Sequence, residues 1–562
     1  MNDLDHHLIR ERLTYPRPEA VTAIPPVSAY EWKLADQHGN AFGRWLYRSA
    51  PSAENDPSDA PWTDVFGRDV HQSEFLVGAD FAITAIADDE AFSIHRVVPP
   101  AAPVEIFRRV EKLSVRALSA DEQFILVQST QDGNWYRPEL LVLDIGGHVR
   151  ARLGAVEGVV GCRADRGAWA PAPGDTRIAI LHEAGGFAQP AIWHPFEDRV
   201  EPVLTGLEGE IGGFSSIQRG ITWDRTGRAL ILLRSLDGRS DLHRFDLHTG
   251  KRELIQPRDG TVSSHEVDAS NQVIGIVGAN DRFIQRFRES ERLPTPDFRP
   301  TRPLHRWHFR RIAGVPCFIA GQRPPDDAPR WTIFDGYGMP GYHYSDGYSG
   351  VLAAWVDHGF QLVVVNTHGT SGFGRKWRES TQPDLGFIEL EDMRRVRAAL
   401  IDEGVVDARR TILSGSSWGG LMTLLGMGTQ PDLWAMGLAT VPVGDYEACH
   451  WEASPLIRAV NRTMFGGNAR THAAAYRRAS PLTYVDHVRR PILISTGRDD
   501  LLCPLQQNLN YVNALRARGG VCDLHIYEGG HAPANVAERI AWITRQLEFA
   551  IHHARAFDLG SA

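Results

Sequence analysis

The chain has 562 residues, of which 43% are hydrophobic and 23% are charged. This length and composition predict a folded protein with a large core and more than one domain, and they exclude a fibrous or low-complexity protein. The 60 basic and 69 acidic residues give a net charge of −9 without a basic run of the kind that binds nucleic acid, so we expect no nucleic-acid partner.

The beginning of the chain and its cysteines bear on where the protein works. Residues 1–7 are polar and acidic, unlike a secretory signal, and no apolar run reaches the ~18 residues that a membrane helix needs. We therefore expect a cytoplasmic protein with no membrane partner. The cysteines are odd in number and lack CxxC spacing, which argues against a disulfide framework and against a cysteine zinc site. They are Cys162, Cys317, Cys449, Cys503 and Cys522.

One sequence phrase recurs in the N-terminal half: a turn with an acidic or polar residue, followed by three to six apolar residues. It begins at residues 78, 121, 174, 227 and 271, at intervals of 43 to 53 residues. A period near 45 is typical of four-stranded propeller blades. Later strands at 140–144 and 242–247 fit the same units. We predict an N-terminal segment (1–28) and a six- or seven-bladed β-propeller (29–297), with a β-sandwich as the alternative.

The sequence pattern changes after a Pro-rich linker at 293–303. From 298 to 562, apolar strand patterns alternate with helical patterns, which predicts a parallel sheet with helices on both faces, as in an α/β-hydrolase domain. The expected strands are 331–334, 361–365, 411–414, 436–440, 491–495 and 523–527. The expected helices are 350–357, 389–403, 418–426, 505–518 and 534–554.

The segment 415–420, Gly-Ser-Ser-Trp-Gly-Gly, matches the G-x-S-x-G pattern of a nucleophile elbow. This residue pattern alone is weak evidence for an elbow, but the segment directly follows an expected strand and directly precedes an expected helix. Glycines on both sides let the backbone turn sharply and leave Ser417 exposed at the helix N-terminus. Ser416 is the neighbouring alternative, although only Ser417 has Gly at both −2 and +2. We therefore expect Ser417 to be a nucleophile.

A serine nucleophile needs a base that is oriented by an acid. In an α/β-hydrolase domain these follow in the order Ser, Asp, His. Asp499 and Asp500 both lie at the end of the strand expected at 491–495, and His531 lies in a glycine loop after the strand expected at 523–527. His531 is thus the expected base, and the acid is one of the two aspartates.

An acyl-transfer site also needs donors for the oxyanion. The backbone N–H of Trp418, directly after the nucleophile, is one candidate. The glycine loop at 335–341, which follows an early strand, supplies the second candidate, the phenol of Tyr337. An ordinary Gly-Pro turn with a packed tyrosine is the alternative for this loop.

Six C-terminal segments resemble, in order, those of the prolyl oligopeptidase family of serine peptidases, which includes dipeptidyl and acylaminoacyl peptidases. They are similar to its oxyanion tyrosine loop, glycine-rich segment, nucleophile elbow, Ser-Pro, acid loop and histidine. Here they stand at 336–338, 367–374, 415–420, 479–482, 497–507 and 531. The resemblance implies an N-terminal propeller joined to a C-terminal α/β-hydrolase domain. The spacing in the acid loop favours Asp500 over Asp499.

The chain also departs from the family pattern. His368 stands where the family commonly has Arg, and Leu501 and Leu502 stand where a prolyl-specific enzyme usually carries Arg. The propeller has no convincing double-Glu motif of the dipeptidyl type, and Ala532 follows His531 where glycine is more usual. These departures argue against strict prolyl endopeptidase specificity.

The resulting hypothesis is a serine peptidase that hydrolyses short peptides or N-acylated amino acids through an acyl-enzyme, with no metal or organic cofactor. One alternative is an esterase, acyl transferase or cyclase acting on a small acylated substrate. Another is a catalytically dead, propeller-based binding protein. Assembly into a homo-oligomer is compatible with the sequence. Residues 442–467 are expected to help line the acyl pocket, unless they only pack or face solvent. The candidates are Trp451, Glu452 and Phe465.

Overall fold

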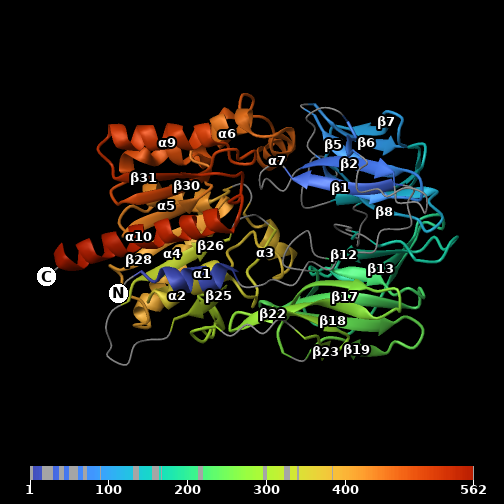
Figure 1. Cartoon of the computed structure of the whole chain (residues 1–562), viewed down its shortest axis with the longest axis horizontal. Helices are drawn as coiled ribbons and strands as arrows, with labels where there is room; N and C mark the ends of the chain where they lie inside the picture. Colours follow the sequence, from blue (N-terminus) through green and yellow to red (C-terminus); the bar gives the residue numbers. More distant parts are fainter. Residues whose placement is uncertain are drawn as a thin grey trace.

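The computed structural model describes most of the chain. The described residues are 4–14, 30–36, 43–49, 61–66, 72–88, 90–130, 138–154, 164–165, 167–212, 219–257, 259–294, 300–321, 330–337, 341–381 and 384–560. They form a β-rich N-terminal part and a mixed α/β C-terminal part that lie side by side (Figure 1).

The N-terminal part consists of antiparallel sheets in sequence order. The described residues form five of them, the first with seven strands and the others with three to five. The first sheet contains β1 (Tyr30–Asp36), β2 (Gly43–Ser49), β3 (Thr63–Asp64), β4 (Gln72–Val77), β5 (Ala82–Ala87), β6 (Phe92–Val97) and β7 (Val104–Arg109). The second contains β8 (Leu113–Leu118), β9 (Phe124–Thr130), β10 (Pro138–Asp144) and β11 (Val149–Leu153). The third contains β12 (Ile178–His182), β13 (Gln189–His194) and β14 (Arg199–Pro202).

Two further sheets complete this part. The fourth contains β15 (Glu210–Ile211), β16 (Ile221–Trp223), β17 (Ala229–Leu236), β18 (Arg239–Asp246) and β19 (Arg252–Leu254). The fifth contains β20 (Thr261–Val267), β21 (Val273–Ala279), β22 (Arg282–Arg288) and β23 (Glu291–Arg292). The blade number of six or seven and the domain limits remain predictions, and the limits at 28/29 and 297/298 lie outside the described residues.

Each repeated sequence phrase forms a turn followed by a buried strand. The strands β5, β9, β12, β17 and β21 follow the five turns. Glu122 and Asn271 adopt positive φ angles of 59° and 62° in these turns. Turns of successive units also touch: the Ala79 N–H donates to Glu122 at 3.0 Å, and the Arg225 N–H donates to Asn271 at 2.7 Å. The sequence repeat is therefore a structural repeat whose units lie next to one another.

The C-terminal part is built on one eight-stranded sheet in the order β24-β25-β27-β26-β28-β29-β30-β31. The strands from β27 to β31 in this order are parallel, and β24 and β25 add an antiparallel edge. They are β24 (His308–Ile312), β25 (Val315–Ala320), β26 (Thr332–Gly336), β27 (Gln361–Val365), β28 (Thr411–Ser416), β29 (Met436–Thr440), β30 (Ile492–Gly497) and β31 (Cys522–Tyr527).

Side chains of each strand alternate between two helix layers, as the period of two in a strand requires. In β28, Leu413 packs with α4 (Phe387–Asp402), α5 (Trp418–Thr429) and α9 (Leu505–Ala517). Its neighbour Ile412 packs on the other face, with α2 (Gly350–Asp357) and α10 (Val536–Gly560). The predicted propeller joined to an α/β-hydrolase domain is confirmed.

Several elements were not predicted. They are the helix α1 (His6–Thr14), the strands β24 and β25, α3 (Arg375–Glu379), α6 (Tyr446–Glu452), α7 (Pro455–Phe465), α8 (Ala473–Ala479) and a 3-10 helix (Pro481–His487). Helix α1 packs through Ile9 and Leu13 with α2 and α10, so it belongs with the C-terminal core and not with the propeller (Figure 1).

Candidate active site

The predicted elbow is a strand–turn–helix. Strand β28 ends at Ser416, α5 begins at Trp418, and Ser417 between them has φ 56° and ψ −113°. A positive φ in a non-glycine residue is strained and characteristic of this type of turn. Ser417 is half-buried, and its N–H donates to the Thr440 carbonyl at 2.9 Å. The alternative nucleophile, Ser416, is exposed at the end of the strand.

Close backbone contacts explain the glycines on both sides of Ser417. A Cβ on Gly415 would lie 2.5 Å from the Gly419 carbonyl carbon. A Cβ on Gly419 would lie 2.3 Å from the Gly336 oxygen and 3.2 Å from the Tyr337 oxygen. Any side chain at these positions would push neighbouring backbone away. The elbow therefore packs directly against the end of β26, where the predicted oxyanion loop begins.

Of the two aspartates, Asp500 is the one that contacts His531. Its Oδ2 lies 2.9 Å from His531 Nδ1, and Asp500 is only 3% exposed. Its other oxygen accepts the N–H groups of Leu502 and Cys503 at 2.8 and 2.9 Å. Asp499 is exposed, and its N–H donates to Gly529 in the loop that carries His531.

The carboxyl ends of the parallel strands bring these residues to one edge of the sheet. Tyr337 follows β26, Ser417 follows β28, Asp500 follows β30, and His531 follows β31. Ligands bind at this edge in open α/β sheets. The structure thus gathers the three predicted triad residues and Tyr337 on one side of the domain.

Tyr337 is half-buried in an aromatic group. Its ring stacks on Tyr342 with centroids 5.8 Å apart and meets the edge of Tyr344 at 4.6 Å. Burial raises the pKa of Tyr337 well above its usual value, so the phenol keeps its proton. The residues 338–340 of the predicted loop lie outside the described residues.

Behind the elbow, the Trp418 indole N–H donates to Glu389 at 3.2 Å. Glu389 is 2% exposed and also accepts the Gly386 N–H at 2.9 Å. Burial raises the pKa of Glu389 to about 8. The Trp418 backbone N–H lies in the first turn of α5, where N–H groups have no partner within the helix. Sequence reasoning missed Glu389, because nothing near it in the sequence marks it as a neighbour of the elbow.

His368, at the position where Arg was more usual, pairs with a buried carboxylate. Its Nδ1 lies 2.6 Å from Asp392, which also accepts the His368 N–H, and its ring stacks on Trp377 with centroids 3.7 Å apart. The imidazole is therefore held by Asp392 of α4 and Trp377 of α3.

The three pocket candidates have different surroundings. Phe465 packs against Tyr446 and Tyr476, with ring centroids 4.9 and 4.2 Å apart. Trp451 is 45% exposed, with Arg470 over its ring. Glu452 is exposed and lies near the backbone of Gln507 at the start of α9.

Phe465 belongs to an apolar cluster that reaches the elbow next to Ser417. Trp418 and Leu502 are its other partly buried members. The buried members are Leu421, Val443, Tyr446, Cys449, Ala469, Tyr476, Ala479 and Cys503. The Cys503 side chain lies close to that of Ser417, and burial raises the pKa of this thiol well above its usual value. Cys503 was not predicted to be near the site, although it lies only three residues after Asp500.

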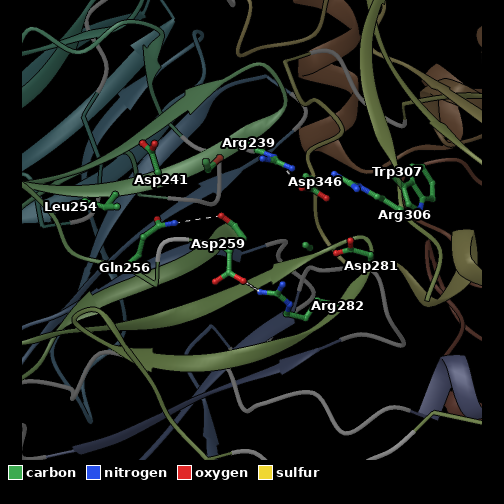
Figure 2. Close-up of a pocket in the computed structure, with 13 residues that line it drawn as sticks. Arg239, Asp241, Leu254, Gln256, Asp259, Asp281, Arg282, Arg306, Trp307 and Asp346 are labelled. Carbon is green, nitrogen blue, oxygen red and sulfur yellow. Dashed lines mark hydrogen bonds and ion pairs between the residues drawn. The ribbon is translucent and has the colours of Figure 1, made fainter. Parts of the chain in front are cut away.

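A cavity of about 370 Å³ lies elsewhere, between the fourth and fifth propeller sheets and the C-terminal domain (Figure 2). Arg239, Asp259 and Arg282 line it from the propeller, and Arg306 and Asp346 line it from the other domain. It contains none of the predicted site residues, and Asp259 pairs with Arg282 across it. Within the described ranges, no three His, Cys, Asp or Glu side chains are grouped to hold a metal ion.

The elbow serine, the hydrogen-bonded Asp–His pair and the tyrosine beside them, at the carboxyl edge of a mostly parallel sheet, have the arrangement of an α/β-hydrolase site next to a propeller. Residues 347–556 match the model of the prolyl oligopeptidase family, Peptidase_S9. This match agrees with the family resemblance that the sequence motifs predicted for the C-terminal part of the chain.

Individual proteins are similar in sequence to part of this chain. Acylamino-acid-releasing enzyme 2 of Oryza sativa subsp. japonica is 28% identical over 203 residues, which cover 35% of this chain and 26% of that protein. Dipeptidyl aminopeptidase BIII of Pseudoxanthomonas mexicana is 25% identical over 198 residues, covering 34% and 28%. The chain thus matches about a quarter of the length of these relatives.

A solved structure matches over both parts of the chain. The crystal structure of puromycin hydrolase has a TM-score of 0.78 and 16% identity, covering 98% of this chain and 96% of that chain. It therefore shares the arrangement of a propeller and an α/β-hydrolase domain. In the part of this chain that the structure describes, no helix is both long and apolar enough to span a membrane.

Proposed function

We propose that this protein is a serine peptidase that hydrolyses short peptides or N-acylated amino acids through an acyl-enzyme. The observation that carries the proposal is the Asp500–His531 hydrogen bond at the same sheet edge as the strained elbow serine, Ser417. The family domain at 347–556 supports the same chemistry.

In the proposed mechanism, Ser417 Oγ attacks the carbonyl carbon of the scissile amide while His531 takes the hydroxyl proton. Asp500 accepts the Nδ1 hydrogen bond of His531, which leaves Nε2 as the base and stabilises the imidazolium. Tyr337 and the Trp418 N–H donate to the oxyanion, each contributing on the order of 3 kcal/mol in the transition state. His531 then protonates the leaving amine, and water releases the acyl group by the same steps.

We also propose that the acyl side chain lies against the apolar cluster around Phe465. The cluster adjoins the nucleophile through Trp418 and through the contact of Cys503 with Ser417. Aromatic and aliphatic surface of this kind favours an apolar side chain over a charged one. The exposed Trp451 and Glu452 are weaker candidates for this contact.

The test is turnover on a panel of chromogenic substrates with Ser417→Ala as the control. The panel contains free-amine, N-acetylated and internally blocked peptides with apolar residues, a simple ester, and puromycin, since a puromycin hydrolase shares the fold. We expect cleavage of one peptide class and its loss in Ser417→Ala. Labelling by a fluorophosphonate probe measures the nucleophile independently of the substrate.

The remaining outcomes separate the alternatives. Ester turnover alone, or labelling without peptide cleavage, would favour an esterase, acyl transferase or cyclase acting on a small acylated substrate. Absence of both labelling and turnover would favour a catalytically dead binding protein. Four cysteines in the part of the chain that the structure describes are buried and unpaired, which supports a cytoplasmic location, because reduced thiols are usual in that compartment. Cell fractionation tests the location, and light scattering tests whether the protein is a homo-oligomer.

A further inference from the structure

A buried ionic cluster joins the propeller to the C-terminal domain at α3. Arg378 makes a two-pronged contact with Glu183 of the propeller, at 2.8 and 2.6 Å. Glu210, from the next sheet, lies 3.7 Å from the same guanidinium, and Glu379 lies 3.4 Å from it. The side chains of Arg378, Glu183 and Glu210 are 6%, 1% and 5% exposed. Figure 1 shows α3 at the boundary between the two parts of the molecule.

Glu210 also binds the glycine-rich segment of the C-terminal domain directly. Its Oε2 accepts the N–H groups of Gly372 and Gly374, at 3.1 and 3.2 Å. Next to them, the Arg375 N–H donates to the Gly186 carbonyl of the propeller at 2.7 Å. Gly372 and Gly374 have φ angles of 84° and 89°, so the segment is tightly bent where the propeller carboxylate meets it.

The glycine-rich segment in turn holds the loop of Tyr337. The Gly341 N–H donates to the Gly369 carbonyl at 2.8 Å, and the Ser371 N–H donates to the Tyr342 carbonyl at 3.4 Å. Tyr342 stacks on Tyr337. A continuous set of short contacts therefore runs from the propeller carboxylate to the tyrosine beside the nucleophile elbow.

We propose that Glu210 of the propeller is a positioning residue for the oxyanion donor Tyr337, acting through the glycine-rich segment. The inference rests on the proposed serine hydrolase function. The contact of the propeller with the C-terminal domain then sets the position of the proposed oxyanion donor. The charge of Glu210 suits this role, since the carboxylate accepts two backbone N–H groups while Arg378 balances it. Burial alone would lower the pKa of Arg378, but the contacts with Glu183, Glu210 and Glu379 together outweigh it and raise the pKa, so the guanidinium stays charged.

The test measures the rate of labelling by a fluorophosphonate probe, together with kcat and KM on the best substrate of the panel. In Glu210→Ala we expect labelling and kcat to fall on the order of tenfold with KM little changed, since small misplacements of a catalytic group are costly. Glu210→Gln keeps one acceptor oxygen and should lose less. If Glu210→Ala does not fold, the loss in Glu210→Gln provides the test.

The matched control is Asp237→Asn. Asp237 also reaches across the domain boundary, to Arg311 at 3.1 Å, but this pair is exposed. It meets the glycine-rich segment where Arg311 lies over the Phe373 ring, and Asp237 does not bind the N–H groups of Gly372 and Gly374 that Glu210 binds. We expect the wild-type labelling rate in this variant. A general loosening of the two domains would instead slow both variants, and that result would overturn the inference.

A double-mutant cycle with Tyr337→Phe shows whether Glu210 acts through the phenol. If it does, adding Glu210→Ala to Tyr337→Phe should slow labelling less than twofold. If the rate reductions of the two substitutions multiply in the double mutant, the inference is overturned. A wild-type labelling rate in folded Glu210→Ala would also overturn it. Neither result would affect the proposed function. Absence of labelling in the wild-type protein would overturn the proposed function and this inference with it.

Discussion

Glu389 is a buried carboxyl directly behind the elbow of Ser417, the proposed nucleophile, and its neighbours affect its pKa in opposite directions. Burial favours the neutral acid, and the nearby Asp392 acts in the same sense. The N–H groups of Trp418 and Gly386 favour the carboxylate. Burial is the larger effect and raises the pKa to about 8. The carboxyl therefore titrates within the range where enzymes are usually assayed.

This pKa predicts a pH-dependent stability. Between the ordinary pKa of a glutamate and about 8, the folded protein holds the proton that the unfolded chain has released. The free energy of unfolding should therefore fall as pH rises through this window, by at most about 1.4 kcal/mol per pH unit. Glu389→Gln should remove that slope. Urea-unfolding midpoints of both proteins from pH 5 to pH 9 measure it, and parallel curves would contradict the prediction.

At the scale of elements, the elbow and the end of β26 are in direct contact, and that contact sets the distance between Ser417 and Tyr337. The contact depends on the missing side chain at Gly419, where a Cβ would lie 2.3 Å from the Gly336 oxygen. The proposed nucleophile and the proposed oxyanion donor are thus held together by the packing of two backbones.

Gly419→Ala should therefore lower kcat by about 100-fold or more, because it separates these elements by a fraction of an ångström to an ångström. Gly426→Ala is the control in the same helix: its Cβ would meet the side chains of Leu413 and Leu390 and not the loop. The control should lower the melting temperature and keep kcat. Equal losses of kcat in both variants would show that general damage to α5 is responsible.

Sequence patterns predicted the elements in which apolar residues recur at regular spacing or which follow turn residues. Strand β29 and helix α2 lie at their predicted limits, since glycines, polar residues and apolar runs mark both ends. The patterns could not predict α3, which is only five residues long and is held by the propeller through Arg378. They also could not place Glu389 or Cys503, because contacts between residues distant in sequence carry no local signal.

The choice between two adjacent aspartates illustrates the same limit. Both Asp499 and Asp500 follow β30, and the residues alone left them open. In the structure, Asp500 points to His531 and is buried, while Asp499 is exposed. The distinction lies in the direction of the chain at the strand end, which the hydrogen bonds of Leu502 and Cys503 to Asp500 determine.

At the scale of the whole molecule, the N-terminal helix α1 lies far from the propeller strands that follow it in sequence. Arg12 of α1 is fully buried and contacts Asp357 at the end of α2, at 2.7 Å. It also donates to the Arg302 carbonyl in the segment that leads from the propeller into the C-terminal domain. One guanidinium thus joins α1, α2 and the interdomain connection.

Removing this guanidinium should lower the stability of the folded protein. Burial alone would raise the pKa of Asp357, but hydrogen bonds from His305 and Arg12 outweigh it, so the pKa lies below its usual value and the carboxylate is charged at neutral pH. Arg12→Ala leaves that buried charge poorly compensated, and such losses typically destabilise a protein by about 3–5 kcal/mol. We expect a lower unfolding midpoint for the C-terminal domain in scanning calorimetry.

The control for this prediction is Arg10→Ala, in the same helix, because Arg10 is exposed. Arg10→Ala should unfold at the wild-type temperature. The difference between the two variants should shrink as pH falls through the lowered pKa of Asp357, because the protonated carboxyl no longer needs a cation. A difference that stays constant as pH falls through the pKa of Asp357 would assign the effect of Arg12→Ala to lost packing and not to the ion pair.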